Sequence, residues 1–228
     1  MEGEEIKLSA FADDTSYFVK DESAAINLLS TIESFSKISG LQVNRSKSEC
    51  LILKCESQKD NYEETFLDIP VVETVKVLGH YFGKNKLICN FQNYYSKIDK
   101  IEKIVNIWKV RDLTLFGKNT LINALIDSQI IFNAQIETPP LEFYKIIERV
   151  KKNFLWGGGT PKIAHSSLIG RFDQGGIMYK DLSSQIRALN VKFITNLKQC
   201  RSNRKVLPLY WILNSFEKSS NIKEITYA

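Results

Sequence analysis

The sequence has few of the residues that build metal centres. It contains only two histidines and four cysteines in 228 residues, and no two cysteines form a Cys-x-x-Cys pair. That spacing is typical of zinc sites, so a zinc site is not expected. The cysteines are Cys50, Cys55, Cys89 and Cys200. Free thiols in a reducing compartment are the simplest interpretation of them.

Long apolar stretches are also absent. No run approaches the roughly twenty residues that span a bilayer, and no charged-then-apolar leader begins the chain. We therefore expect an intracellular protein, nuclear or cytoplasmic, with no membrane partner. A hydrophobic content of 43% and an aromatic content of 11% indicate a folded chain. The formal net charge of +5 suits a polyanion such as nucleic acid but does not require one.

Glycine is missing from a segment where a tight turn would favour it. In "LSAFADDTSYFV", Leu8 to Val19, two strand-like runs flank Asp13 and Asp14. A turn that only reversed the chain would favour Asn-Gly or Asp-Gly, because glycine adopts positive φ without steric cost. Two adjacent carboxylates repel each other. A cation bound beside them is the simplest explanation of the pair.

The chain has a β-rich sequence pattern in its first part and a helical pattern in its second, which together predict an α+β protein. Up to about Gly83, short β-rich runs surround one helix that Asp21 caps and Gly40 ends. Short strands are expected at 41–43 and 49–54, around a polar turn, and a longer one at 72–83 with a bend at Gly79. From about Gln92 the apolar spacing is helical, and it predicts helices over 93–110, 117–136, 141–156 and 182–197.

Six motifs in a fixed order resemble reverse transcriptases of non-LTR (LINE-type) retrotransposons. They are "FADDT", "FSKISGLQVNRSKSE", "VKVLGHYFG", "WKVRDLTLFGKNTLINALIDSQIIF", "FLWGGGTPKI" and "DQGGIMYKDL". The resemblance covers nearly the whole chain. It implies a right-hand polymerase fragment in which 1–90 is the C-terminal part of an incomplete palm, 91–155 is a helical thumb, and 156–228 is a post-thumb loop and helical region.

The resemblance also implies roles for single residues in the first part. Asp13 is the expected principal Mg²⁺ ligand and catalytic carboxylate, and Asp14 is expected to assist or orient it. Lys47 is similar in position to a lysine near the nucleotide, although a solvated surface lysine explains it as well. Leu78 and Gly79 resemble a primer-grip hairpin, and an ordinary β-bulge is the alternative.

The helical part carries two sets of basic residues that nucleic acid could contact. One set is expected on the first thumb helix and the other on a later helix: Lys97, Lys100 and Lys103, then Lys145, Arg149 and Lys152. A merely solvated helix face accounts for either set, because Glu102 and Glu148 interrupt them. The partners that the resemblance implies are an RNA template, a DNA primer and deoxynucleoside triphosphates.

The resemblance implies missing parts as well. The fingers and the earlier palm strand, with its metal-binding aspartate, would precede Met1, so the chain by itself is expected to be inactive. Three interpretations stay open: a piece of an RNA-directed DNA polymerase, a non-catalytic nucleic-acid-binding module, and a retrotransposon relic without a defined function.

Overall fold

The computed structural model describes residues 7–53 and 65–199, with side chains up to residue 196. Cys55 and Cys200, discussed above as free thiols, lie outside the described residues. The described chain divides into two compact units. One contains the residues up to Val75 together with Phe82–Asn85, and the other contains Lys76–Tyr81 and the residues from Lys86 onward.

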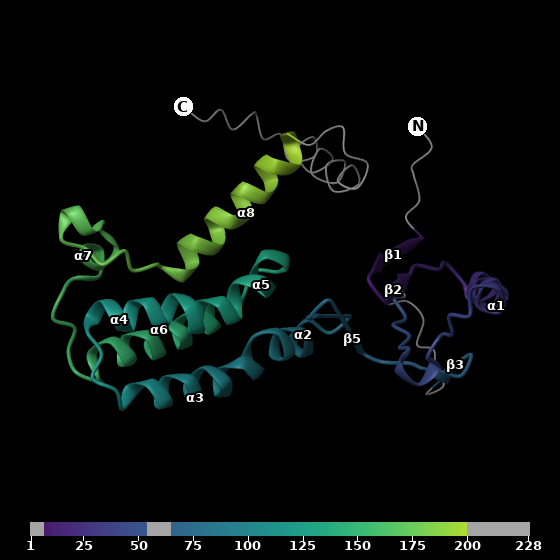
Figure 1. Cartoon of the computed structure of the whole chain (residues 1–228), viewed down its shortest axis with the longest axis horizontal. Coiled ribbons are helices and arrows are strands. Elements are labelled where there is room, and N and C mark those ends of the chain that lie inside the picture. Colours follow the sequence, from purple (N-terminus) through teal and green to yellow (C-terminus); the bar gives the residue numbers. More distant parts are fainter. Residues whose placement is uncertain (1–6, 54–64, 200–228) are drawn as a thin grey trace. The chain divides into compact units, whose positions relative to one another are not determined.

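The first unit begins with a hairpin and a helix. Strands β1 (Leu8–Phe11) and β2 (Asp14–Tyr17) pair antiparallel, and α1 (Glu22–Ser39) follows them (Figure 1). The Asp21 carboxylate accepts a hydrogen bond of 2.8 Å from the Ala24 amide, and Gly40 ends the helix at a left-handed φ of 73°. Both caps were predicted from the sequence and are confirmed, because a side-chain acceptor and a glycine satisfy the free groups at the helix ends.

The predicted strands at 41–43 and 49–54 are wrong within the described residues. A short 3₁₀ helix, η1 (Arg45–Lys47), occupies the polar turn, and only Cys50 forms a bridge, which is parallel, to Val71. The Asn44 side chain begins η1 by accepting from the Lys47 amide, so a local Asn cap replaces strand pairing. Strands β3 (Thr65–Phe66) and β4 (Ile69–Pro70) form a small second hairpin.

The expected long strand over 72–83 is a third hairpin. Strand β5 (Thr74–Val77) pairs with β6 (His80–Gly83), and Leu78 and Gly79 form the turn between them. The bend that Gly79 predicted is therefore a full reversal of the chain. The three hairpins and the helices together confirm the α+β class.

The second unit is helical apart from the tip of the third hairpin. Its α-helices are α2 (Lys86–Asn93), α3 (Ile98–Lys109), α4 (Leu115–Leu121), α5 (Ser128–Ile136), α6 (Leu141–Trp156), α7 (His165–Ile169) and α8 (Leu182–Gln199). Three shorter elements are the 3₁₀ helices η2 (Tyr95–Lys97) and η4 (Phe172–Gln174) and the π-helix η3 (Ile122–Asp127). Helix α6 packs against α3 and α4, and α8 packs against α5 (Figure 1).

Helical spacing predicted α3, α4, α5, α6 and α8, but not α2 or α7 and not the interruptions inside the expected helices. The helix expected at 93–110 is broken by η2, and the helix expected at 117–136 contains the π-helix η3. The expected helix over 141–156 is confirmed as α6, which follows Pro140 and ends at left-handed Gly157. None of the helices in the described residues has the length and apolarity to cross a membrane.

One apolar core holds the second unit together. Its fully buried members come from most of the helices and include Tyr94, Ile101, Ile122, Ile130, Phe143, Ile147, Leu182 and Ile186. The apolar stripes of α3 and α6 supply much of this core, as their spacing predicts. On α8 the stripe is buried only in its first half, because Phe193 is half exposed.

The "DQGG" motif is explained by a close backbone approach. A Cβ placed on Gly176 would lie 2.0 Å from the carbonyl oxygen of Gly170, so no side chain fits at position 176. The Met178 amide donates to that same oxygen at 3.0 Å, and the Ile177 and Tyr179 amides donate to the Leu168 carbonyl. Glycine therefore lets the segment after η4 lie directly against the end of α7.

Candidate functional site

The paired aspartates lie at the turn of the first hairpin. Leu8 pairs with Tyr17 and Phe11 pairs with Asp14, so only Ala12 and Asp13 form the loop. Asp14 is consequently the first residue of β2 rather than part of the loop. The hairpin predicted from the sequence is present, and its register places the two carboxylates on adjacent residues across the boundary between turn and strand.

The residue before the pair has a strained backbone. Ala12 has a φ of 54°, which is the left-handed region that glycine adopts freely. For a residue with a Cβ this conformation costs about 1–2 kcal/mol. Such strain is frequent at functional sites, where the surrounding structure holds the backbone in place. The absence of glycine at position 12 therefore makes the folded state less stable.

The two carboxylates fit part of a magnesium site. Both residues are solvent-exposed, and carboxylate oxygens are the hard ligands that Mg²⁺ prefers. Across the described residues, no group of three or more histidine, cysteine, aspartate or glutamate side chains gathers closely enough to hold a metal ion. Asp13 and Asp14 therefore offer two carboxylates, and the remaining ligands of an octahedral site must be supplied by other groups.

Lys47 lies in the first unit on the 3₁₀ helix η1. Its side chain is exposed, and its backbone amide is tied to Asn44. The neighbouring Arg45 makes the ion pairs of this segment, at 2.7 Å to Glu33 and 3.6 Å to Asp68. The geometry keeps Lys47 available for a ligand, and its place near a nucleotide stays a prediction.

The turn of the third hairpin is also strained. Leu78 and Gly79 have φ angles of 48° and 86°, the pattern of a type I′ hairpin turn, which usually carries Asn-Gly. The alternative interpretation as an ordinary β-bulge is not what the structure has. Leu78 is about half exposed (49%), and Gly79 lies against the Phe132 ring of α5. An apolar side chain is thus presented at a fixed hairpin tip, and its contact with a primer stays a prediction.

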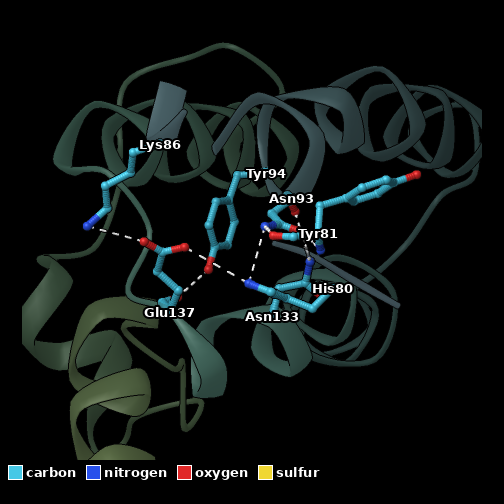
Figure 2. Close-up of polar contacts among 7 residues, drawn as sticks. All are labelled: His80, Tyr81, Lys86, Asn93, Tyr94, Asn133 and Glu137. Carbon is cyan, nitrogen blue, oxygen red and sulfur yellow. Dashed lines mark hydrogen bonds and ion pairs between the residues drawn. The ribbon is translucent and has the colours of Figure 1, made fainter. Parts of the chain in front are cut away.

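Two buried asparagines, which sequence reasoning missed, fasten this hairpin to the helices (Figure 2). The Asn93 side chain accepts from the Tyr81 amide at 2.8 Å and donates to the Tyr81 carbonyl at 2.9 Å. It therefore pairs with β6 as a neighbouring strand would. Asn133 of α5 donates to the Asn93 side-chain oxygen at 3.1 Å. We call this pair of side chains the asparagine clasp.

A second polar group lies beside the asparagine clasp. Buried His80 has its Nε2 atom 3.3 Å from Asn93 and 4.0 Å from the Glu137 carboxylate, and burial lowers the pKa of His80. The Tyr94 hydroxyl donates to the Glu137 carbonyl oxygen, and Lys86 pairs with the Glu137 carboxylate at 3.3 Å. In Figure 2 the Tyr81 ring points away from these contacts, so its backbone alone is held.

Replacing Asn93 with alanine should lower the free energy of unfolding by about 2–3 kcal/mol. The variant leaves the partly buried amide and carbonyl of Tyr81 without their partner. Each unsatisfied group costs about 1–3 kcal/mol, part of which entering water can recover. Urea unfolding followed by circular dichroism measures the change. The matched control is Asn106→Ala at an exposed position of α3, which should change the free energy of unfolding by less than about 0.5 kcal/mol. Equal effects of the two variants would contradict the role of the asparagine clasp.

The first set of basic residues separates into buried and exposed members. Lys97 is half-buried, and its Nζ atom donates to the Gln129 carbonyl of α5 at 2.8 Å. Burial, together with the charges of Lys100 and Lys76, lowers the pKa of Lys97 to about 8. Lys100 is exposed and donates to the Gln129 side chain at 2.9 Å, and Lys103 is exposed on α3.

The second set lies on α6, with all three side chains exposed: Lys145, Arg149 and Lys152. Lys145 pairs with Glu142 at 2.7 Å, so its charge is partly neutralised. Arg149 and Lys152 remain accessible to a polyanion. Both sets belong to the second unit, and Asp13 and Asp14 belong to the first.

The sequence analysis missed a buried ion-pair cluster around Lys151, which lies between Arg149 and Lys152 in the sequence. Lys151 is fully buried, with its Nζ atom 3.2 Å from Asp127, 3.3 Å from Glu148 and 3.1 Å from the Lys180 carbonyl. The ammonium group also lies 4.7 Å from the centre of the Tyr179 ring. Burial raises the pKa of Asp127 and of Tyr179. This cluster joins η3, α6 and the segment before α8.

Comparison with known proteins gives one informative similarity. The chain is 28% identical over 156 residues to the "Transposon TX1 uncharacterized 149 kDa protein" of Xenopus laevis. The aligned region covers 67% of this chain and 12% of that protein, so the chain corresponds to a small part of its relative. No protein-family model matches the chain. The sequence is therefore similar to a transposon-encoded protein.

Proposed function

We propose that this chain is a segment of the RNA-directed DNA polymerase, or reverse transcriptase, of a non-LTR retrotransposon. In this proposal Asp13 and Asp14 bind Mg²⁺ in the complete enzyme. The observation that carries it is the strained two-residue turn, at which the consecutive residues Asp13 and Asp14 are both exposed. The similarity to a transposon-encoded protein and the ordered motifs of the sequence support the same proposal.

The residues of the hairpin would hold the metal for nucleotidyl transfer. Asp13, in the turn, is the principal ligand, and Asp14, fixed by strand pairing with Phe11, assists it. Bound Mg²⁺ would supply activation of the primer hydroxyl and neutralisation of the triphosphate. The short, strand-paired loop limits the movement of the carboxylates, and a preorganised ligand pair is what such a site needs.

Exposed apolar side chains on the first hairpin support its place in a larger sheet. Leu8, Phe11 and Phe18 are each more than half exposed, although strand residues of this kind are usually covered. Leu8 and Phe11 lie on opposite faces of the hairpin, and the remaining parts of a polymerase palm would cover these side chains. The proposal therefore accounts for a feature that a two-stranded hairpin by itself does not explain.

The helical unit would serve as the thumb and hold template and primer. Lys103, Arg149 and Lys152 are exposed on α3 and α6, where they can contact phosphates without reading sequence. The partners in this proposal are an RNA template, a DNA primer and deoxynucleoside triphosphates. The thumb boundary at 91 and the post-thumb boundary at 156 belong to the proposal as well.

Primer extension on an RNA template tests the proposal with the chain alone and with an added fragment that carries fingers and the earlier palm strand. The chain alone should not extend the primer, because two carboxylates cannot complete the coordination that Mg²⁺ demands. Extension should appear on complementation. Extension by the chain alone would contradict the need for a further acidic ligand. Nucleic-acid binding without extension in the complemented protein would favour a non-catalytic binding module instead.

A further inference from the structure

A cavity of about 290 Å³ lies between the third hairpin and the helices of the second unit. The hairpin contributes Lys76, Gly79 and Tyr81, and the segment from α2 to η2 contributes Gln92, Ser96 and Lys97. Asn133 of the asparagine clasp completes the wall. Because the clasp fixes the backbone of Tyr81 to Asn93, the hairpin side of this cavity has a defined position.

The charge around the cavity is of one sign. Lys76 and Lys97 both line it, and none of the described residues in its lining is acidic. Lys100 of α3 lies close enough to reach the same glutamine as Lys97. Like charges gathered in a partly buried place repel each other, so an anion in the cavity would relieve a cost that the free protein carries.

Hydrogen-bonding groups suited to an oxyanion also face this space. The Gln129 carbonyl takes one of the three N–H groups of Lys97, which leaves donors for a ligand. Gln92 also lines the cavity, and its side-chain oxygen is buried and accepts no hydrogen bond from the described residues.

The volume of the cavity is sufficient for a small anion. Sites for whole small molecules have volumes of about 300–1,000 Å³, and this one lies at the lower limit. A phosphate group and its water fit in this volume. We infer that this cavity is a phosphate site, in which Lys97 and Lys76 bind one phosphodiester group of a nucleic-acid strand. The identification of the ligand as a nucleic-acid strand rests on the proposed function, whereas the binding of a phosphate group does not.

Such a site should depend on pH between about 7 and 9. The groups that face Lys97 are Lys76 from β5, buried His80 from β6, Lys100 from α3 and the Gln129 carbonyl from α5. Burial lowers the pKa of Lys97 to about 8, and the positive charges of Lys100 and Lys76 act in the same direction. The ammonium form binds an anion and the neutral amine does not, so affinity should fall as the pH rises through this value.

Fluorescence anisotropy of a labelled oligo(dT) strand with the full chain tests this inference. At pH 7, Lys97→Gln should weaken binding about fivefold at about 0.1 M salt, the loss expected for one phosphate contact on a single strand. Lys97→Arg, which stays charged, should keep the affinity at pH 7 and lose the decline between pH 7 and 9. Lys109→Gln, at an exposed position at the end of α3, is the matched control and should keep both the affinity and that decline.

Lys76→Gln is a second variant. The Lys76 side chain is exposed, so this variant still tests the site if a change at half-buried Lys97 disturbs folding. It should weaken binding and also move the midpoint of the decline to higher pH, because a neighbouring positive charge is removed. Inorganic phosphate should compete with the strand in the wild-type chain and less in the Lys97→Gln variant.

Three results would overturn the inference: no binding of the strand, affinity that does not change between pH 7 and 9, or a decline that persists in Lys97→Arg. If the strand does not bind but inorganic phosphate by itself does, the cavity is an anion site for a free phosphate and not for nucleic acid. The inference and the proposed function can fail separately, since pH-dependent strand binding with no primer extension by the complemented protein would refute only the polymerase.

Discussion

Replacing Lys151 with methionine should lower the free energy of unfolding by about 3–5 kcal/mol. The side chain is fully buried and lies within ion-pair distance of Asp127 and Glu148. Methionine has a similar volume, so little cavity forms, but the Asp127 carboxylate is then buried without its positive partner. Removing one member of a buried ion pair has a cost of this size because the remaining charge is uncompensated.

Two comparisons separate the charge effect from a packing effect. In the double variant Lys151→Met with Asp127→Leu, both charges are absent, and the loss should be far smaller than that of Lys151→Met alone. Lys152→Met, at the next and exposed position, should change the free energy of unfolding by less than about 0.5 kcal/mol. Urea unfolding followed by helical circular dichroism measures all three. A double variant as unstable as the single one would show that packing, not charge pairing, accounts for the loss.

Local signals in the sequence predicted much of the helical structure. Asp21 and Gly40 define both ends of α1 because capping depends on residues within one turn of the helix end. Helix α6 likewise follows Pro140 and ends at left-handed Gly157. The apolar spacing of α3 and α6 predicted which faces are buried, since that pattern is set by the helical repeat alone.

Interruptions and turns were less predictable. Neither proline nor glycine marks η2 or the π-helix η3, so nothing local signals either break. The turns at Leu78 and Ala12 have positive φ in residues that rarely adopt it. A turn rule based on glycine therefore predicted a bend at position 79 but not the hairpin. The first hairpin was predicted from the two strand-like runs that flank the aspartates.

The buried polar groups show where sequence reasoning stops. Lys151 is spaced four residues after Ile147 and three before Phe154, so it stands on the buried stripe of α6, and that spacing was a usable signal. Its partner Asp127 is buried through a π-helix that the sequence does not reveal. The clasp formed by Asn93 and Asn133 joins residues 40 positions apart, so only the tertiary structure shows it.

In a complete polymerase that contains this segment, Asp13→Asn should abolish most primer extension. The substitution removes a charged oxygen ligand in the hairpin turn, keeps the size of the side chain and leaves the pairing of β1 with β2 unchanged. Loss of one metal ligand acts on the reacting atoms, so the rate should fall by about a hundredfold or more. Affinity for the primer-template should stay nearly constant, because the lysines and arginines that contact phosphates are untouched.

The control for this variant is Asp173→Asn, which removes the same charge from an exposed residue of η4. It should extend primers at the wild-type rate. Comparing the two variants excludes a general effect of net charge on nucleic-acid binding, which the paired affinity measurements also report.

The most direct test of the account is therefore the rate of RNA-templated primer extension in Mg²⁺ by the complete polymerase carrying Asp13→Asn, measured at saturating primer-template. We predict extension reduced by about a hundredfold or more, with wild-type affinity for the primer-template and wild-type extension in Asp173→Asn. Extension at the wild-type rate by Asp13→Asn would contradict the assignment of the hairpin turn as the metal site.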